Sequence, residues 1–206
     1  MIRLHRTLAG AAATCALAAA LVDARPAINA TTLAAEIEAE RDHISAPELA
    51  DRIMRQDPTL RLFDLRPRAE YDALHIPTAS HATLDELSHL PFARDATVVV
   101  YSEGSAHAAQ AWVLLRLRGV RQVYFLREGI YEWIARVREP RLAVDATAAE
   151  RAEFDRAVPL SRFFGGVAQS SVPRSEVPEG YWTGNAAPGA PSRAAQAIAQ
   201  VRRRGC

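Results

Sequence analysis

Apolar residues in the middle of the chain alternate between a spacing typical of strands and one typical of helices. The runs 60–65 and 97–101 predict strands. The second is apolar over nearly its whole length, which is typical of a sheet covered on both faces. Residues 106–118 and 128–137 predict helices, and 122–126 predicts a strand between them. This alternation with short connections predicts an α/β fold in three layers, with a central parallel sheet and helices on both faces.

Two capping boxes predict where helices begin, because a Ser or Thr and a Glu three residues later can satisfy each other's backbone amides. Ser45-Ala-Pro-Glu48 begins one helix, and Asp57-Pro58 predicts its end. Thr147-Ala-Ala-Glu150 begins another, predicted to reach about residue 157. These signals extend the predicted fold on both sides of the central strands.

The flanking segments have a different composition. Residues 31–41 predict a charged helix that leads into the core. Residues 165–191 are rich in Gly, Pro and Ser and predict an extended wrap or a loose linker, and 192–204 predicts a last helix with one apolar side.

The N-terminus carries the pattern of a secretory signal peptide. A basic start (residues 1–6) precedes the uncharged run Thr7–Val22, and small residues follow it. The run is shorter than the ~20 residues of a membrane-spanning helix. Cleavage after Ala24 or after Ala30 is consistent with the pattern, so we expect an exported, periplasmic protein. The alternative is an uncleaved segment that anchors the protein in the membrane, the one case in which a membrane is an expected partner.

Composition and charge narrow the function classes. The chain of 206 residues has a net charge of +1, so no overall field attracts nucleic acid, and no nucleic-acid partner is expected. The two cysteines are Cys15, within the apolar run, and Cys206 at the end of an arginine-rich tail. Cys15 lacks the leucine-like residue expected before a lipid attachment site. If the N-terminal run is removed, Cys206 is the one remaining thiol, and nearby arginines favour its thiolate.

Three segments together resemble the rhodanese-like domain family. Leu62–Tyr71 reads L-F-D-L-R-P-R-A-E-Y and is followed by H-I-P-x-A from His75, similar to a strand ending in D-x-R, then E-[YF] and H-I-P-x-A. Residues 98–115 are similar to the family's strand, active-site loop and following helix. Residues 123–133 are similar to its closing V-x-x-L-x-G-G-x-x-x-W. The resemblance covers roughly residues 43–138.

The resemblance implies a division of the chain and a site. Residues 1–30 are the predicted signal peptide or anchor, 31–138 a rhodanese-like domain, and 139–206 a helical and Pro/Gly-rich extension. It implies that Asp64 and Arg66 lie at the carboxyl end of a central strand, where open α/β sheets bind ligands, with Glu70 and His75 within reach. The implied active-site loop begins at residue 102, and its predicted binding residues are Glu103, Gly104, Ser105, Ala106 and His107. No cofactor and no metal site are expected.

The chain also departs from the family's pattern. Ser102 stands where active rhodaneses carry the cysteine that takes up sulfur, Glu103 and His107 stand where arginine is frequent, and Leu74 and Thr78 replace glycines. A hydroxyl cannot form a stable persulfide, and a serine nucleophile needs an adjacent base. His107 is a conceivable base, but no third residue is evident to orient it, and a solvent-facing position in the first helical turn explains it more simply.

The loop amides are still expected to form a nest at a helix N-terminus that binds a small anion or sulfur compound weakly, because Glu103 adds negative charge. Asp64 and Arg66 could instead form only an internal salt bridge. We therefore expect an exported binding or regulatory module without sulfurtransferase activity. The first alternative is a sulfurtransferase or sulfur carrier that uses Cys206. The second is a scaffold whose extension docks a protein partner or wraps the domain, for which Phe163, Phe164, Tyr181 and Trp182 supply apolar contacts.

Overall fold

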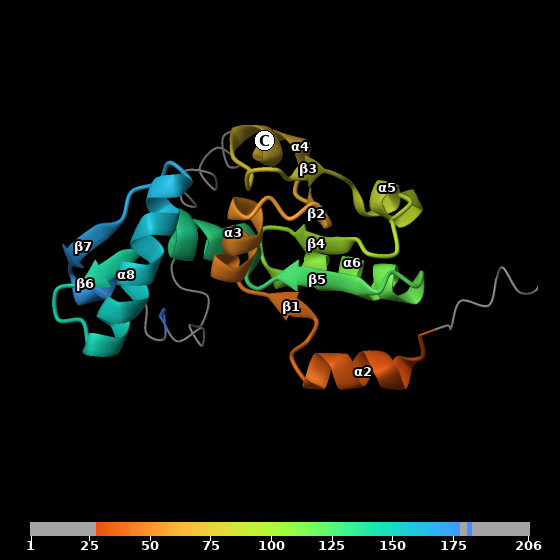
Figure 1. Cartoon of the computed structure of the whole chain (residues 1–206), viewed down its shortest axis with the longest axis horizontal. Coiled ribbons are helices and arrows are strands. Elements are labelled where there is room, and N and C mark those ends of the chain that lie inside the picture. The colour runs from red at the N-terminus through yellow and green to blue at the C-terminus, as the bar shows by residue number, and fades with distance from the viewer. Residues whose placement is uncertain (1–27, 178–180, 183–206) are drawn as a thin grey trace, which may run out of the picture.

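The computed structural model describes residues 28–177, 181 and 182. A five-stranded sheet with the strand order β1-β5-β4-β2-β3 forms its centre, and all of its strand pairs are parallel. Helices cover both faces (Figure 1). The predicted α/β fold in three layers is therefore confirmed.

The elements of this domain follow one another in the predicted alternation. They are α2 (Ala30–Glu38), β1 (His43–Ile44), α3 (Ala46–Met54), β2 (Leu60–Asp64), α4 (Arg68–Ala73), β3 (Ser80–His81), α5 (Leu84–His89), β4 (Thr97–Tyr101), α6 (Ser105–Leu117), β5 (Gln122–Leu126), α7 (Gly129–Glu132) and a π-helical turn, η1 (Trp133–Arg138). The extension adds β6 (Arg141–Ala143), α8 (Ala148–Phe163), β7 (Gln169–Val172) and a 3₁₀ turn, η2 (Arg174–Glu176).

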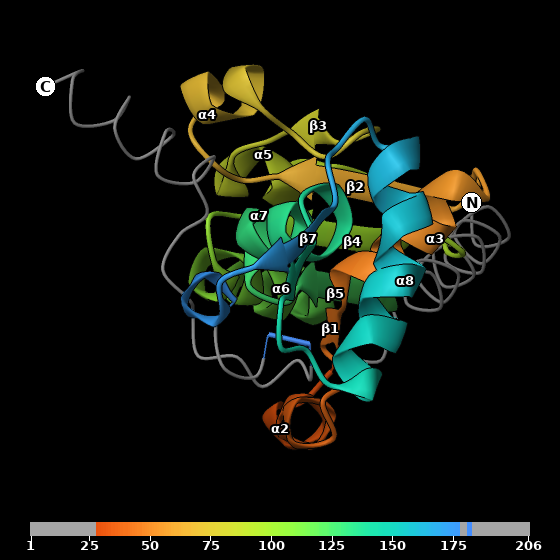
Figure 2. The same cartoon turned by 90° about the vertical axis from the view of Figure 1, so that its left-hand side faces the viewer.

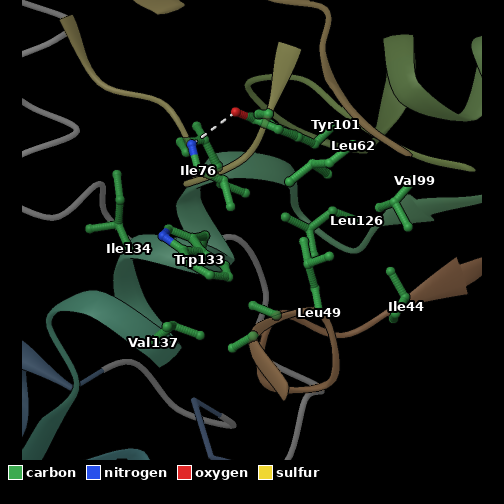
Figure 3. Packing of buried hydrophobic residues seen from close by; sticks show 14 residues of the cluster. Ile44, Leu49, Leu62, Ile76, Val99, Tyr101, Leu126, Trp133, Ile134 and Val137 are labelled. Atoms are coloured by element: carbon green, nitrogen blue, oxygen red, sulfur yellow. Dashed lines mark hydrogen bonds between the residues drawn. The ribbon is translucent and has the colours of Figure 1, made fainter. Parts of the chain in front are cut away.

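Each face of the sheet has its own apolar core, because successive residues of a strand point to opposite faces. On one face, Leu62 and Val99 pack with Leu49 of α3 and Trp133 of η1 (Figure 3). On the other face, side chains of β2, β4 and β5 pack against α2, α5 and α6 in a second cluster. All five residues of β4 are buried, as its nearly continuous apolar run predicts.

Several element boundaries differ from the prediction. The two-residue strands β1 and β3 were not predicted, because strands of that length show no periodicity. The predicted helix 128–137 is α7 followed by the π-helical turn. The predicted end near residue 157 is wrong: α8 continues through Pro159 to Phe163. Leu160 and Phe164 pack against the first core cluster, and this burial favours the last turns although a proline removes one helical hydrogen bond.

The extension forms a small layer of its own beside α3, with β6, β7 and α8 (Figures 1 and 2). Its strands pair in parallel, and Leu142, Phe154 and Trp182 belong to its apolar cluster. The predicted helix 192–204 and the N-terminal run both lie outside the described residues. No helix in the described part of the chain has the length and apolar character needed to cross a bilayer.

Candidate functional site

The loop after β4 begins at the carboxyl end of the sheet. Ser102, its first residue, is 3% exposed. Gly104 is the N-cap residue of α6 and supplies no side-chain cap, so no side chain caps the amides of the first turn. Open space surrounds the position where a Cβ of Gly104 would lie. Open space therefore lies beside the N-cap of this 13-residue helix, and the anion-binding nest expected over 102–107 stays a prediction.

The turn into α7 braces this loop. The amide of Ile130 donates to the carbonyl of Ser102 at 3.0 Å. The amide of Glu128 donates to Ser105 Oγ at 3.2 Å, and the Tyr131 hydroxyl donates to Glu103 Oε1 at 2.8 Å. The carboxylate of Glu103 is thus engaged by a side chain of the neighbouring helix.

The bracing requires a close approach of two backbones. Gly129 has a φ of +59°, and a Cβ built on it would lie 2.2 Å from the carbonyl oxygen of Ser102. Glu128, the residue before it, also has a positive φ, +50°. The sequence signal for this contact is the closing motif around residue 129. The predicted site did not include Glu128, Gly129 or Tyr131, because a motif does not show which backbone its glycine approaches.

Asp64 and Arg66 form a buried ion pair next to the loop. Arg66 Nη2 lies 2.6 Å from Asp64 Oδ2 and donates to the Leu74 carbonyl at 2.5 Å. Both residues are at most 2% exposed, and Arg66 Nη1 lies 3.7 Å from Glu70 Oε2. Burial lowers the pKa of Arg66, but the hydrogen bond and charge of Asp64 outweigh it, and the net pKa is raised. The hydrogen bond to the Leu74 carbonyl joins this pair to the segment around Leu74, and its predicted role in ligand binding stays a prediction.

Tyr101 links β4 to the same segment. Its hydroxyl oxygen accepts a hydrogen bond from the amide of Ile76 at 3.0 Å, drawn in Figure 3. Burial and the neighbouring charge of Asp64 raise the pKa of Tyr101, so the phenol stays neutral. Asp64 and Tyr101 are register partners on adjacent strands, which brings the ion pair and the residue before Ser102 to one edge of the sheet.

The two histidines of the predicted site lie on the surface. His75 is exposed, stacks on Tyr71 with ring centroids 4.1 Å apart, and hydrogen bonds through Nδ1 to the Tyr71 carbonyl at 2.9 Å. His107 is exposed in the first turn of α6. Among the described residues, no group of His, Cys, Asp and Glu side chains is arranged to hold a metal ion. Cys15 and Cys206 lie outside the described residues.

Glu132, on α7, is a buried side chain whose carboxyl pKa is strongly raised. It is 8% exposed, and its Oε2 accepts a hydrogen bond from the amide of Ala46 at 3.2 Å, at the start of α3. Burial raises the pKa of Glu132 to about 7, against the opposing influence of Arg136 and of the Ala46 hydrogen bond. No sequence pattern indicates this buried carboxyl group, because its burial results from the packing of α7 against α3.

The fold and the loop at the end of β4 define an α/β domain with its candidate site at the carboxyl edge of a parallel sheet. Residues 45–136 match the family model described as "Rhodanese-like domain". This part of the chain is therefore similar to rhodanese-like domains, and an additional C-terminal region follows it.

Solved structures are similar to part of the chain. The Alr3790 protein of Anabaena is 27% identical over 44% of this chain and 74% of its own, with a TM-score of 0.41. The human single-domain sulfurtransferase TSTD1 is 25% identical over 45% of this chain and 95% of its own, with a TM-score of 0.41. A rhodanese-related protein of Thermoplasma volcanium is 23% identical over 45% and 89%, with a TM-score of 0.38. No curated protein sequence matches the chain.

Proposed function

We propose that the rhodanese-like domain is a binding or regulatory module without sulfurtransferase activity. One observation carries this proposal: the loop after β4 begins with Ser102, at the position where the family resemblance implies a cysteine. Sulfur transfer requires a thiolate that becomes a persulfide and then passes its outer sulfur to an acceptor. A serine hydroxyl has no stable persulfide counterpart, so the wild-type loop cannot store sulfur.

The geometry supports weak binding of a small anion in place of catalysis. The start of α6 has backbone donors without a side-chain cap and open space at Gly104, and a helix N-terminus favours negative charge. Glu103 opposes this by placing a carboxylate on the same loop. A neutral or weakly charged sulfur compound fits these opposing influences better than a divalent anion.

The proposal is tested with Ser102→Cys in a thiosulfate:cyanide sulfurtransferase assay. We expect no turnover above background for the wild type, and turnover for Ser102→Cys if the loop keeps its family geometry. Cys206→Ser is the matched control, since it removes the remaining thiol of the processed chain. Turnover by the wild type that disappears in Cys206→Ser would support the sulfur-carrier alternative. Turnover that survives Cys206→Ser would contradict the proposal.

We further propose that the protein is exported and that processing occurs after Ala24 and not after Ala30. Asn29 caps α2 by accepting a hydrogen bond from the amide of Thr32 at 2.9 Å, and Ile28 packs against the second core cluster. Cleavage after Ala30 would remove both contacts. The intact mass of the exported protein distinguishes the two sites, and the mass of the unprocessed chain would indicate a retained anchor.

For the extension, we propose a stabilising role within the domain in addition to any protein partner. Trp182 is 6% exposed, and the Arg136 guanidinium lies 5.3 Å from its ring centroid. Arg136 also donates to the Tyr181 carbonyl at 2.8 Å. Phe164 packs edge-on against Trp133, whereas Phe163 is 58% exposed. Three of the four aromatic residues considered for docking are thus engaged by the domain itself.

A further inference from the structure

On β1, a histidine side chain lies between a carboxylate and a guanidinium. His43 Nδ1 lies 2.8 Å from Asp42 Oδ1, and Arg127 Nη2 lies 2.6 Å from His43 Nε2. Arg127 directly follows β5, the strand beside β1 (Figure 1), and its amide donates to the Ile44 carbonyl at 3.1 Å. The side chains of Asp42 and His43 are only 11% and 14% exposed. These three residues are called the Asp42–His43–Arg127 network below.

The partners on both sides of the ring determine the protonation state of His43. A guanidinium has no acceptor, so His43 Nε2 must accept from Arg127. An ionised carboxylate has no donor, so His43 Nδ1 must carry the hydrogen that Asp42 accepts. The network therefore requires the neutral imidazole. An imidazolium would direct an N–H group at the N–H group of Arg127, so protonation of His43 would keep the contact with Asp42 and break the contact with Arg127.

The side chain of Arg127 depends on this network for its position. Among the described residues, His43 is the one hydrogen-bond acceptor for the Arg127 guanidinium, and Arg127 Nε is buried without a hydrogen-bond partner there. Glu132 of α7 also attracts Arg127 by its charge. Burial raises the pKa of Glu132 to about 7, against the charges of Arg136 and Arg127 and together with that of Glu128. Acid therefore acts on Arg127 in two ways, since it removes the acceptor on His43 and the charge of Glu132.

Arg127 is also the first residue of the turn that contacts the Ser102 loop. It directly precedes Glu128, which has a φ of +50° although it carries a Cβ. The Glu128 amide donates to Ser105 Oγ at 3.2 Å, and the Ile130 amide donates to the Ser102 carbonyl at 3.0 Å. A backbone conformation of this kind is costly and persists only where surrounding contacts hold it. Loss of the Arg127 side-chain contact therefore favours relaxation of the turn and of the loop that it contacts.

We propose that the Asp42–His43–Arg127 network is a pH-sensitive switch that sets the rigidity of the Ser102 loop. With His43 neutral, Arg127 is bound and the turn after β5 holds the loop. With His43 protonated, Arg127 is released, and the turn and the loop loosen. Histidine is the side chain whose charge ordinarily changes between about pH 5 and 8, so this is the range in which the switch is tested. The switch concerns the conformation of the loop, so it does not depend on whether the loop binds a ligand or transfers sulfur.

The test is amide hydrogen exchange of the full protein, followed by NMR at about pH 7.5 and about pH 5.5 and corrected for the intrinsic pH dependence of exchange. The amides of Glu128 and Ile130 report on the turn, and those of β4 report on the rest of the fold. We expect the protection of the two turn amides to fall about tenfold at the lower pH, the order expected when a hydrogen bond to a charged group is lost. The protection of β4 should stay the same. Turn amides that are equally protected at both pH values would overturn the proposal.

Three variants assign the effect to a residue. His43→Gln keeps an acceptor for Arg127 but does not titrate, so the turn amides should be equally protected at both pH values. Glu132→Gln removes the second titrating group, and a smaller pH effect should remain. His89→Gln is the matched control, at an exposed histidine whose Nδ1 bonds to the Asp85 carbonyl, and it should behave like the wild type. A pH effect that persists in His43→Gln and disappears in Glu132→Gln would refute the switch and assign the effect to Glu132.

A second measurement uses the wild type alone and does not depend on the folding of any variant. The nitrogen chemical shifts of the His43 imidazole show which ring nitrogen carries a hydrogen. We expect a hydrogen on Nδ1 alone at about pH 7.5, and on both nitrogens under the conditions in which the turn amides lose protection. A hydrogen on Nε2 at the higher pH would show that Arg127 does not donate to His43, and the network would then have no switching role.

Discussion

At the scale of single residues, Gly129 and Glu132 show how strongly this fold depends on contacts that the sequence does not display. Gly129 holds a left-handed backbone conformation directly against the carbonyl of Ser102. Glu132 is a buried acid of α7 whose carboxylate accepts a hydrogen bond from the amide of Ala46 at the start of α3. Gly129 allows the close approach to the candidate loop, and Glu132 is expected to make the stability of the domain depend on pH.

Gly129→Ala should destabilise the domain by about 3 kcal/mol, combining the cost of a positive φ in a residue with a Cβ and the cost of overpacking. The measurement is the free energy of unfolding in urea. Gly104→Ala is the matched control on the same loop, since open space surrounds its Cβ position, and it should cost about 1 kcal/mol or less. Equal losses for the two variants would argue against the close approach of residue 129 to Ser102.

Glu132→Gln should remove a pH dependence of stability. Burial raises the pKa of Glu132 from its ordinary 4.5 to about 7, so folding favours its protonated form. The stabilising contribution of this proton is full below pH 4.5 and is lost as the pH rises through 7, with a total change of about 3 kcal/mol. Glutamine keeps an acceptor for the Ala46 amide and does not titrate. Comparing urea unfolding of both proteins from pH 4.5 to pH 8 tests this, and parallel curves would contradict it.

At the scale of secondary-structure elements, the N-termini of the helices show which predicted capping hydrogen bonds form. Thr147 and Glu150 form both hydrogen bonds of the predicted capping box. Ser45 caps α3 through the Glu48 amide as predicted, but Glu132, from α7, binds the amide of Ala46. The start of α3 is therefore capped both by the local residue Ser45 and by Glu132, a residue distant in the sequence.

The cap of α2 provides a test at this scale. Asn29→Ala should lower the free energy of unfolding by about 1 kcal/mol, because it removes the acceptor for the Thr32 amide. Thr31→Ala, at an exposed neighbouring position, is the control and should change stability by less than about 0.5 kcal/mol. No difference between the two would mean that α2 does not contribute to the cooperative unit, and the argument against cleavage after Ala30 would be lost.

At the scale of the whole molecule, the extension and the rhodanese-like domain share contacts that connect their cores. Ser161 Oγ donates to the Arg138 carbonyl at 2.7 Å, and a Cβ on Gly166 would lie 1.9 Å from the same oxygen. Leu160 and Phe164 pack against the core cluster beneath α3 and η1. The extension is therefore expected to unfold together with the domain.

Trp182→Ala tests this coupling. Loss of a buried tryptophan should cost about 3 kcal/mol, and the domain and the extension should still unfold in a single transition. Val144→Ala, at a side chain 64% exposed, should have little effect. A separate early transition for the extension, or an unchanged stability of Trp182→Ala, would show that the two parts are independent.

The sequence by itself determined the elements whose signals are local. The apolar run of β4 predicts a strand buried on both faces, and the capping residues Ser45 and Thr147 predict where two helices begin. The order of motifs from Asp64 to Trp133 predicts the rhodanese-like fold and the position of the candidate loop. The strand and the helix starts depend on neighbours in the chain, so periodicity and side-chain chemistry are sufficient to predict them, whereas the rhodanese-like fold and the loop position are implied by the resemblance to that family.

Tertiary structure alone decided the features that depend on residues far apart in the chain. The two-residue strands β1 and β3 exist because longer neighbours offer hydrogen bonds, and α8 continues past Pro159 because Leu160 packs against the core. The brace of α7 on the Ser102 loop and the raised pKa of Glu132 arise from packing between elements. Burial, close approach and charge proximity are properties of distance in space, which the linear order of residues does not specify.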